Sequence, residues 1–316
     1  MDVSLFSPAK INLFLAVSGR RADGFHDLVS VVAPLDFGDQ LVAEAGGGRQ
    51  EAGGSRFSLS CDHPDVPTDG SNLVLKAAEA FAVATGWKDP VHFRLAKHIP
   101  PGAGLGGGSS NAVAALRAMN QLSGGLLDEA RLAGVAAKLG SDCALFLVKQ
   151  PVVMRGRGER IEPLPAQAAA RLCGRRVLLF KPSFGIGTPW AYQRMIARGG
   201  DYLPAAEAEA RLAAWLDGAA PVEELLFNNM EPAAFEKYVA LPLLLEKLPG
   251  EFGVRTRMSG SGSACYALLG DPSTVSTGSP RAGSGPATSA EVVTQMKQTI
   301  RGCWGADTFV QEARLA

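Results

Sequence analysis

The sequence lacks an excess of charge of either sign. Its 316 residues include 31 lysines and arginines against 31 aspartates and glutamates, and the basic residues do not form runs. A chain with balanced charge has no long-range field that would draw it to nucleic acid or to an anionic lipid surface. We therefore expect neither a nucleic acid nor a membrane as its partner.

Long hydrophobic runs are also missing. No apolar run approaches the roughly 20 residues that a membrane-spanning helix needs. Residues 11–17, INLFLAV, have the hydrophobicity of a signal-peptide core, but Lys10 is the only basic residue before them and Asp2 precedes both. We expect this segment to be a buried strand of a cytoplasmic protein.

Cysteines and histidines are few and scattered. The five cysteines contain no C-x-x-C pair, and the four histidines show no zinc-like spacing with them. An odd, dispersed set of cysteines is typical of reduced thiols rather than of a disulfide framework. The sequence therefore predicts neither disulfides nor a metal site built from histidine and cysteine.

Hydrophobic residues make up 47% of the chain, which is enough for one large domain or two ordinary ones. Strands and helices are both predicted, so the fold class is α+β. In the 127–140 helix, Asp128 is placed to cap the start and Gly140 to end it. The predicted strands include residues 10–19, 56–62 and 91–99, and the predicted helices include residues 72–86, 127–140, 204–218 and 242–248.

Two halves are predicted. Proline and alanine interrupt the pattern over residues 162–174, where we expect a boundary between domains 1–165 and 166–316. Residues 271–290 are poor in apolar side chains and rich in serine, glycine, proline and threonine, which predicts a mobile insertion. Residues 46–55 have the composition of a flexible hairpin tip.

A glycine-rich loop, PPGAGLGGGSSN at residues 100–111, precedes an alanine-rich helix. It is not a P-loop, because serine rather than lysine follows its last glycine. The dinucleotide pattern G-x-G-x-x-G is present, but Asp128, the acid nearest the required distance, caps a helix instead of ending a strand. Two interpretations remain: an anion site of backbone amides at a helix start, or a flexible turn capped by serine.

Three segments together resemble the three signatures of the GHMP kinases, in the expected order. They are SPAKINLFL at 7–15, the loop at 100–111, and RMSGSGSACYAL at 257–268. The resemblance implies a two-lobed GHMP kinase fold with the active site in the cleft between the lobes. The N-terminal lobe would be like domain 2 of ribosomal protein S5, and the C-terminal lobe would be ferredoxin-like.

Further segments resemble one branch of that family, whose acceptor is a cytidine diphosphate-linked polyol. The resemblance implies ATP-dependent phosphorylation of the 2-hydroxyl of a cytidine diphosphate-linked methylerythritol, in the non-mevalonate route to isoprenoid precursors. The segments are RRADGFHDL at 20–28, LDFGDQL at 35–41, LGSDCALFL at 139–147 and FNNMEPAAFE at 227–236.

Two residues are the catalytic candidates. From the residues alone, Asp142 is equally a general base or the cap of a helix that follows it, and Lys10 could simply extend to the surface. The resemblance implies that Asp142 orients and deprotonates the acceptor hydroxyl. It also implies that Lys10 lies beside Asp142, keeps it ionised and polarises the hydroxyl.

ATP is the expected phosphoryl donor, with Mg²⁺. Ser109 or Ser110 could bind the metal, but no carboxylate partner is evident and the metal ligands stay open. Asn72 and Lys97 match positions near the nucleotide, although one could be a helix cap and the other a surface lysine. The expected ATP-binding residues are Asn72, Lys97, Pro101, Gly102, Ala103, Gly104, Leu105, Gly106, Gly107, Gly108, Ser109, Ser110 and Asn111.

The expected substrate contacts begin with an aromatic pair. Phe25 can stack on a cytosine, and His26 can hydrogen-bond its edge. Phe25 stands where the family usually has tyrosine, so the hydroxyl is lost. Each aromatic side chain could equally belong to the core. By resemblance, the substrate-binding residues are Asn12, Phe25, His26, Thr188 and Tyr192, with Tyr192 closing the other face of the base. Residues 259–263 would pack against the phosphate site or form only a tight turn.

Two rival functions remain open. One is a GHMP kinase for another alcohol, such as mevalonate or homoserine, which carries no base for Phe25, His26 and Tyr192 to hold. The other is a non-catalytic relative that binds ATP or another ligand, which has no need for Lys10 and Asp142. For the assembly, we expect a monomer or a weak homodimer.

Overall fold

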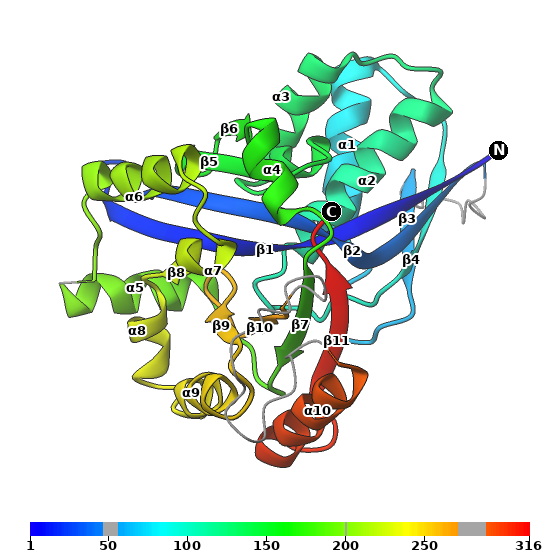
Figure 1. The fold of residues 1–316 in the computed structure, drawn as a ribbon. Coiled ribbons are helices and arrows are strands. Elements are labelled where there is room, and N and C mark those ends of the chain that lie inside the picture. Colours follow the sequence, from blue (N-terminus) through cyan, green and yellow to red (C-terminus); the bar gives the residue numbers. More distant parts are fainter. Residues whose placement is uncertain (47–55, 200, 271–288) are drawn as a thin grey trace. The chain divides into compact units, whose positions relative to one another are not determined.

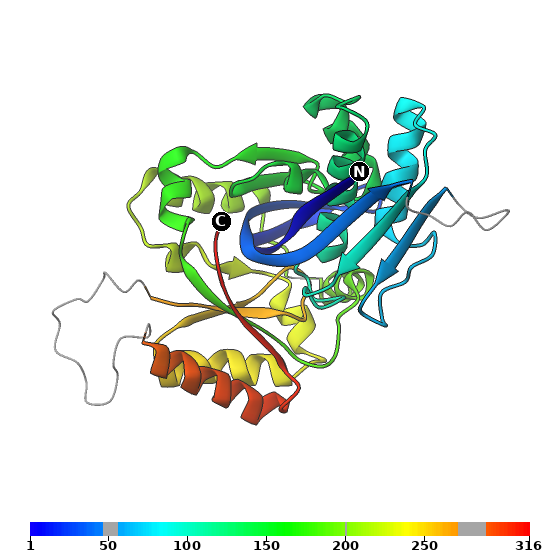
Figure 2. The ribbon, with the colours of Figure 1, turned by 90° about the vertical axis from the view of Figure 1, so that its right-hand side faces the viewer.

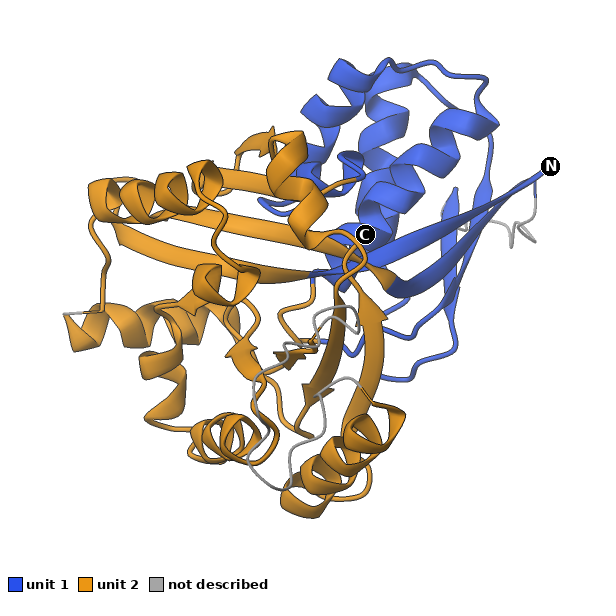
Figure 3. Ribbon diagram, viewed as in Figure 1, with its two compact units in different colours: residues 1–10, 37–101, 106–149 blue, residues 11–36, 102–105, 150–316 orange. Residues whose placement is uncertain are grey.

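The computed structural model describes residues 1–46, 56–199, 201–270 and 289–316. The predicted hairpin tip and the predicted mobile insertion lie almost wholly outside these residues. The chain forms two compact units, which Figure 3 distinguishes by colour. Unit 1 comprises Met1–Lys10, Phe37–Pro101 and Gly106–Lys149, and unit 2 comprises Ile11–Asp36, Gly102–Leu105 and Gln150–Ala316. The predicted boundary at residue 165 stays a prediction, since both units are built from discontinuous segments.

Two long strands, β1 (Asp2–Arg20) and β2 (His26–Ala45), contribute residues to both units. Between them the chain turns tightly, with the Arg21 amide donating to the Phe25 carbonyl at 2.8 Å. The apolar run at the centre of β1 is almost continuously buried, as expected for a strand covered on both faces. The predicted buried strand is therefore confirmed.

In unit 1, strand β4 (Val91–Ala96) pairs antiparallel with residues 40–45 of β2 and parallel with β3 (Phe57–Cys61). Helices α1 (Leu73–Thr85) and α2 (Gly107–Leu122) lie side by side, with α3 (Glu129–Leu139) against them (Figure 1). A short 3₁₀ helix, η1, follows at Ala144–Leu147.

The ends of the unit 1 elements follow from local chemistry. Helix α1 ends at Gly86 in the left-handed conformation, and the Asp128 carboxylate caps α3 by accepting from the Arg131 amide at 2.8 Å. Both predicted helices are confirmed. The strand predicted at 91–99 ends earlier, at Ala96, because the next three backbone amides donate to Asp62 and Asp39 instead of to a neighbouring strand.

Unit 2 contains a four-stranded antiparallel sheet in the order β11–β7–β10–β9. Its strands are β7 (Arg176–Lys181), β9 (Arg255–Met258), β10 (Cys265–Leu268) and β11 (Phe309–Arg314). Helices α9 (Ala240–Phe252) and α10 (Ala290–Trp304) lie side by side on one face of it (Figure 2). This order, with helices before β9 and after β10, is the ferredoxin-like arrangement that the sequence predicts.

The remaining strands of unit 2 pair with β1 and β2. Strand β5 (Val152–Gly156) pairs antiparallel with residues 28–32 of β2 and with β6 (Arg160–Pro163). Strand β8 (Phe227–Asn228) pairs parallel with β1 at Phe14 and Leu15. The other helices are α5 (Thr188–Arg198), α6 (Ala205–Asp217), α7 (Val222–Leu225) and α8 (Glu231–Phe235).

Two expectations about helices need correction. The interrupted pattern at 162–174 contains a helix, α4 (Ala166–Leu172), which Pro165 precedes and whose buried face is Ala168 and Leu172. Helix α9 extends beyond the predicted 242–248 at both ends: it starts at Ala240, continues through Pro249 and ends at Phe252, with Gly253 as its C-cap. The predicted helix at 204–218 is confirmed as α6.

The cysteines and the lengths of the helices bear on two expectations from the sequence. All five cysteines lie among the described residues and are free thiols. Within the described ranges, no helix is long and apolar enough to cross a membrane. The structure thus agrees with the sequence on the thiols.

Candidate functional site

Lys10 and Asp142 meet in unit 1. The Lys10 Nζ lies 3.8 Å from Asp142 Oδ2, and the side chains are 6% and 41% exposed. Burial lowers the pKa of Lys10, and the nearby Asp142 carboxylate opposes that shift. Asp142 does not cap a helix, since η1 starts at Ala144 and the residue before it, Cys143, makes no side-chain cap bond. The pair thus joins a buried cation to a carboxylate that water can reach.

The start of helix α2 lies against Lys10. Gly106 occupies the N-cap position with φ +73°, and a Cβ there would come within 2.9 Å of Lys10 Cγ and 2.8 Å of the Phe146 ring. The first intrahelical bond runs from the Ser110 amide to the Gly106 carbonyl at 2.9 Å. The three preceding amides, at 107–109, therefore point out of the helix end, next to the lysine.

The two serines of the loop have different surroundings. The Ser110 hydroxyl is buried and accepts a hydrogen bond from Ser7 Oγ at 2.8 Å. The Ser109 side chain hydrogen-bonds the Cys143 thiol, whose pKa burial raises to about 11. Ser109 therefore contacts the residue that follows Asp142 in the chain. Among the described residues, no group of three or more His, Cys, Asp or Glu side chains is placed to hold a metal ion.

Lys97 is not a surface lysine. Its Nζ lies 2.6 Å from Asp39 Oδ2, and the side chains are 5% and 0% exposed. Asp39 Oδ2 also accepts from Asn111 Nδ2 at 2.8 Å, and the same amide donates to Ser7 Oγ at 2.8 Å. Sequence reasoning did not single out Asp39 or Ser7. Strand β2 also contains Asp27, which is half-buried, and Asp36, which is exposed, so no local pattern distinguished Asp39 from them.

Asn72 has the structural role that the sequence left open for it. Its Oδ1 accepts from the Val74 amide at 2.9 Å, and its Nδ2 donates to the Pro67 carbonyl at 2.6 Å. It is the N-cap of α1. A contact between Asn72 and a nucleotide stays a prediction.

In unit 2, the middle of the glycine-rich loop packs on residues 259–264. The Ser259 hydroxyl donates to the Gly104 carbonyl at 3.1 Å, and the Ala264 amide donates to the Ala103 carbonyl at 2.9 Å. Gly104 has φ +77°, and a Cβ there would overlap the Ser259 carbonyl oxygen. The third signature is thus a turn between β9 and β10 that also contacts the loop.

The Asn228 side chain hydrogen-bonds the backbone of that turn. Its Nδ2 donates to the carbonyls of Met258 at 2.8 Å and Gly260 at 2.9 Å, and its Oδ1 accepts from the Met230 amide. Because the side chain is buried, these bonds face no competition from water. Sequence reasoning quoted this segment only for its resemblance and assigned no role to Asn228.

Two of the predicted substrate contacts lie near the same turn. The Asn12 amide donates to Ser259 Oγ at 3.4 Å, and its side chain donates to Ser30 Oγ at 2.9 Å. Thr188, the first residue of α5, hydrogen-bonds Ser261 through the two hydroxyls at 2.9 Å. The turn thus links both residues within unit 2.

His26 lies in an aromatic stack. The centroid of its ring lies 4.6 Å from that of Tyr192 and 5.9 Å from that of Tyr202, and both tyrosine rings are stacked on it. Its Nε2 is 3.1 Å from the Tyr202 hydroxyl. Burial, and then the nearby Arg20, lower the pKa of His26. Nothing in the sequence around Tyr202 pointed to this contact.

Phe25 is 50% exposed. The Arg157 guanidinium lies over its ring, 4.9 Å from the centroid. Phe25 is therefore not a core aromatic, and its ring is available to a flat ligand as the sequence expectation requires.

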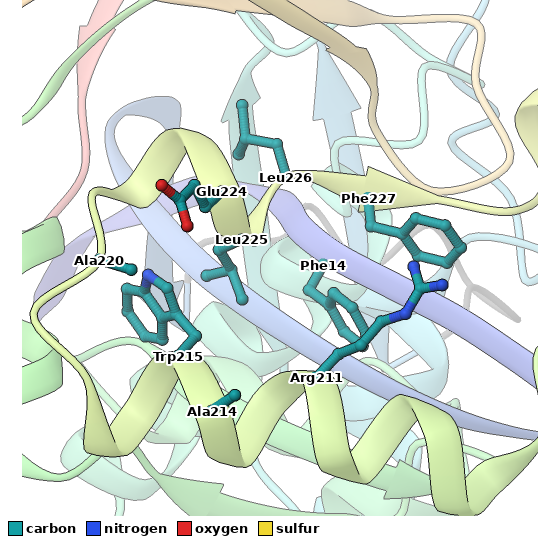
Figure 4. Close-up of a pocket in the computed structure, with 9 residues that line it drawn as sticks. All are labelled: Phe14, Arg211, Ala214, Trp215, Ala220, Glu224, Leu225, Leu226 and Phe227. Atoms are coloured by element: carbon teal, nitrogen blue, oxygen red, sulfur yellow. The ribbon is translucent and has the colours of Figure 1, made fainter.

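A pocket of about 310 Å³ lies elsewhere in unit 2, between α6 and the segment that leads into β8 (Figure 4). Phe14, Trp215 and Phe227 give it aromatic walls, with the charged groups of Arg211 and Glu224 beside them. None of the predicted site residues lines it.

The comparisons with known proteins agree on one family. The model of the GHMP kinases N terminal domain matches residues 72–150. A 4-diphosphocytidyl-2-C-methyl-D-erythritol kinase from Methylacidiphilum infernorum (isolate V4) is 38% identical over 272 residues, which cover 84% of this chain and 86% of that protein.

Solved structures show the same fold. A crystal structure of 4-(cytidine 5'-diphospho)-2C-methyl-D-erythritol kinase matches with a TM-score of 0.72 and 30% identity, over 99% of this chain and 100% of that one. Mevalonate kinase from Methanococcus jannaschii matches with a TM-score of 0.69 and 11% identity, over 100% and 99% of the two chains. The second likeness is one of fold alone.

Proposed function

Because the chain belongs to the 4-diphosphocytidyl-2-C-methyl-D-erythritol kinases of the GHMP kinase family, we propose that it transfers the γ-phosphoryl group of ATP to the 2-hydroxyl of that cytidine diphosphate-linked polyol. The product belongs to the non-mevalonate route to isoprenoid precursors. The structural observation that carries the proposal is the Lys10–Asp142 pair at the start of helix α2. A cytoplasmic location and a monomer or weak homodimer stay predictions.

Asp142 is the proposed general base. Its carboxylate is accessible, so it can accept the proton of an alcohol as the oxygen attacks phosphorus. Lys10 has its ammonium held out of water 3.8 Å from that carboxylate. In this position it orients Asp142 and stabilises negative charge that develops on the acceptor oxygen.

The loop from Pro101 to Asn111 is the proposed cradle for the ATP phosphates. The amides at 107–109 lie at the positive end of the α2 dipole, where phosphate groups bind favourably. Mg²⁺ fits this site, because it takes most of its ligands from phosphates and water and needs few protein groups. When bound with ATP, it neutralises charge on the transferring phosphate. Of the two candidate serines, Ser109 is the one that would bind it, because the Ser110 hydroxyl is buried against Ser7.

Recognition of the cytidine is assigned to the aromatic residues of unit 2. The exposed ring of Phe25 offers a face for stacking, and Tyr192 supports the neutral His26 ring. Asn12 and Thr188 are the proposed polar contacts of the acceptor. Asn72 and Lys97 stay candidate nucleotide contacts, although their side chains already serve as a helix cap and as the partner of Asp39.

The test is ADP release with the cytidine compound, mevalonate and homoserine as separate acceptors. We expect turnover with the cytidine compound alone, and a loss of at least about 100-fold in Asp142→Asn. Asp128→Asn is the matched control, because asparagine also caps a helix and activity should be retained.

Each other outcome is informative. Turnover with mevalonate or homoserine would keep the kinase but contradict the roles of Phe25, His26 and Tyr192. ATP binding without turnover of any acceptor would favour a non-catalytic relative.

A further inference from the structure

One side chain holds both ends of the glycine-rich loop. Asp39 Oδ1 accepts from the backbone amides of His98 and Ile99, each at 2.7 Å, immediately before the loop. Asp39 Oδ2 accepts from Asn111 Nδ2 at 2.8 Å, in the second turn of α2 after the loop. A single carboxylate therefore bonds the chain on both sides of residues 100–107.

The contacts of Asp39 are strong because they are shielded from water. The carboxylate is fully buried, and Lys97 Nζ, 2.6 Å away, supplies its counter-charge. A buried carboxylate without partners is strongly unfavourable, whereas four donors occupy its two oxygens here. Such a group tolerates little displacement of any of its partners.

Lys97 places its charge beneath the helix start. A Cβ added at Gly107 would lie 2.9 Å from Lys97 Nζ, so the ammonium contacts the first residue of α2. A cation at this end of a helix is disfavoured by the helix dipole in the absence of an anion. Asp39 supplies that anion from the protein interior. The amides at 107–109 are therefore left to bind the phosphates in the proposed function.

We propose that Asp39 is a positioning residue for the nucleotide: it fixes both ends of the glycine-rich loop so that the amides at the start of α2 are arranged before ATP binds. The inference rests on the proposed function. A loop with this many glycines loses much conformational entropy when it becomes ordered. If the loop is already ordered in the free protein, this loss does not reduce the affinity for ATP.

The first test is ATP binding by isothermal titration calorimetry without acceptor, in Asp39→Asn. The substitution keeps the shape and one oxygen, but it turns an NH₂ group toward the Lys97 ammonium and Asn111 Nδ2. We expect the Kd for ATP to rise by at least about tenfold, with KM for ATP rising in parallel. The KM for the acceptor should be unchanged.

A double variant distinguishes positioning from general damage. In Asp39→Asn/Asn111→Asp the amide and the carboxylate exchange places, so the link across the loop and an anion near Lys97 are both restored. We expect the Kd for ATP to return to within about threefold of that of the parent protein. Asp62→Asn is the matched control: Asp62 also accepts from the Lys97 amide, at 2.8 Å, but it is exposed, and its hydrogen bonds are with Cys61, Leu95 and Lys97 rather than with α2. It should bind ATP normally.

Three results would overturn the proposal: unchanged ATP affinity in Asp39→Asn, equal weakening of ATP and acceptor, or no recovery in the double variant. If Asp39→Asn does not fold, Asn111→Ala leaves the carboxylate and its bonds to His98 and Ile99 in place, removes the bonds of Asn111 to Asp39 and Ser7, and should still weaken ATP binding several-fold. Failure of the parent protein to bind ATP at all would contradict the proposed function instead.

Discussion

A ring nitrogen of His26 and the hydroxyl of Tyr202 lie 3.1 Å apart, and Tyr192 stacks on the same imidazole. Because burial and Arg20 lower the pKa of His26, the ring is neutral at neutral pH and keeps one donor and one acceptor. The bond to Tyr202 fixes the orientation of the ring. A neutral, oriented imidazole is suited to hydrogen-bonding a base edge.

Removing that bond should affect the acceptor alone. In Tyr202→Phe, the ring stack remains and one hydrogen bond is lost, so we expect KM for the cytidine acceptor to rise by about three- to tenfold. The KM for ATP should not change. Steady-state kinetics with each substrate varied in turn will check this, and an equal rise in both KM values would contradict the assignment of His26.

Whether a single residue's role could be predicted from the sequence depended on where its contact partners lie along the chain. The contact between Lys10 and Asp142 was expected because both lie in segments with a family resemblance, whereas their catalytic roles stay predictions. Asp39 and Tyr202 were missed because their roles arise only when the fold brings them to Lys97 and His26. No local pattern records a contact of that kind.

Among the elements, helix α2 and the glycines that precede it contribute most to the proposed phosphate site. Gly106 has φ +73° and no room for a Cβ beside Lys10 and Phe146, whereas a Cβ at Gly108 would have 3.7 Å to its nearest neighbour, Leu73. The two glycines are two residues apart, yet only the first is required by its backbone conformation and its surroundings.

Alanine substitutions should separate the two. Gly106→Ala forces a left-handed alanine, which costs about 1–2 kcal/mol, and it also displaces Lys10. We expect kcat/KM for ATP to fall by at least about tenfold, with a lower melting temperature. Gly108→Ala is the comparison: it keeps the backbone amide that belongs to the proposed cradle, and alanine is favourable in a helix, so we expect a smaller loss than in Gly106→Ala. Similar losses in both variants would contradict the special role of Gly106.

Most elements could be predicted from the sequence, and the errors have physical causes. Helices α1 and α3 were found because apolar pattern and end signals coincide, and α6 because its stretch is rich in alanine with acids and arginines. Helix α4 was missed because its seven residues lie within a proline- and alanine-rich stretch. The strand ending at Ala96 was overextended because the next three amides donate to the carboxylates of exposed Asp62 and buried Asp39, and no local pattern reveals these contacts.

For the whole molecule, stability should depend on a glutamate that the proposed chemistry does not use. Burial raises the pKa of Glu231 to about 6, and its Oε1 accepts from the Met258 amide at 2.9 Å. The folded protein therefore holds a proton that the unfolded chain has already released. Stability falls as the pH rises from the ordinary value near 4.5 through about 6, and the loss is complete above that.

Glu231→Gln should remove this dependence. The glutamine oxygen still accepts from Met258, but no charge is buried, so we expect a gain of about 2 kcal/mol in the free energy of unfolding at pH 7.5 and little change at pH 4.5. Urea denaturation across that range is the measurement. Glu224→Gln, at an exposed position of the same unit, is the control. An equal pH slope in Glu231→Gln and the parent would contradict the prediction.

The pairing of β7 with β11 has a consequence for synthesis on the ribosome. At roughly 5–20 residues per second, the roughly 130 residues between these strands take on the order of 10 s to translate. During that interval the backbone groups of β7 that will bond β11 have no partner from their own chain. An unpaired strand edge invites pairing with other nascent chains. The yield of folded protein should therefore depend on how well chaperones cover this edge until β11 emerges.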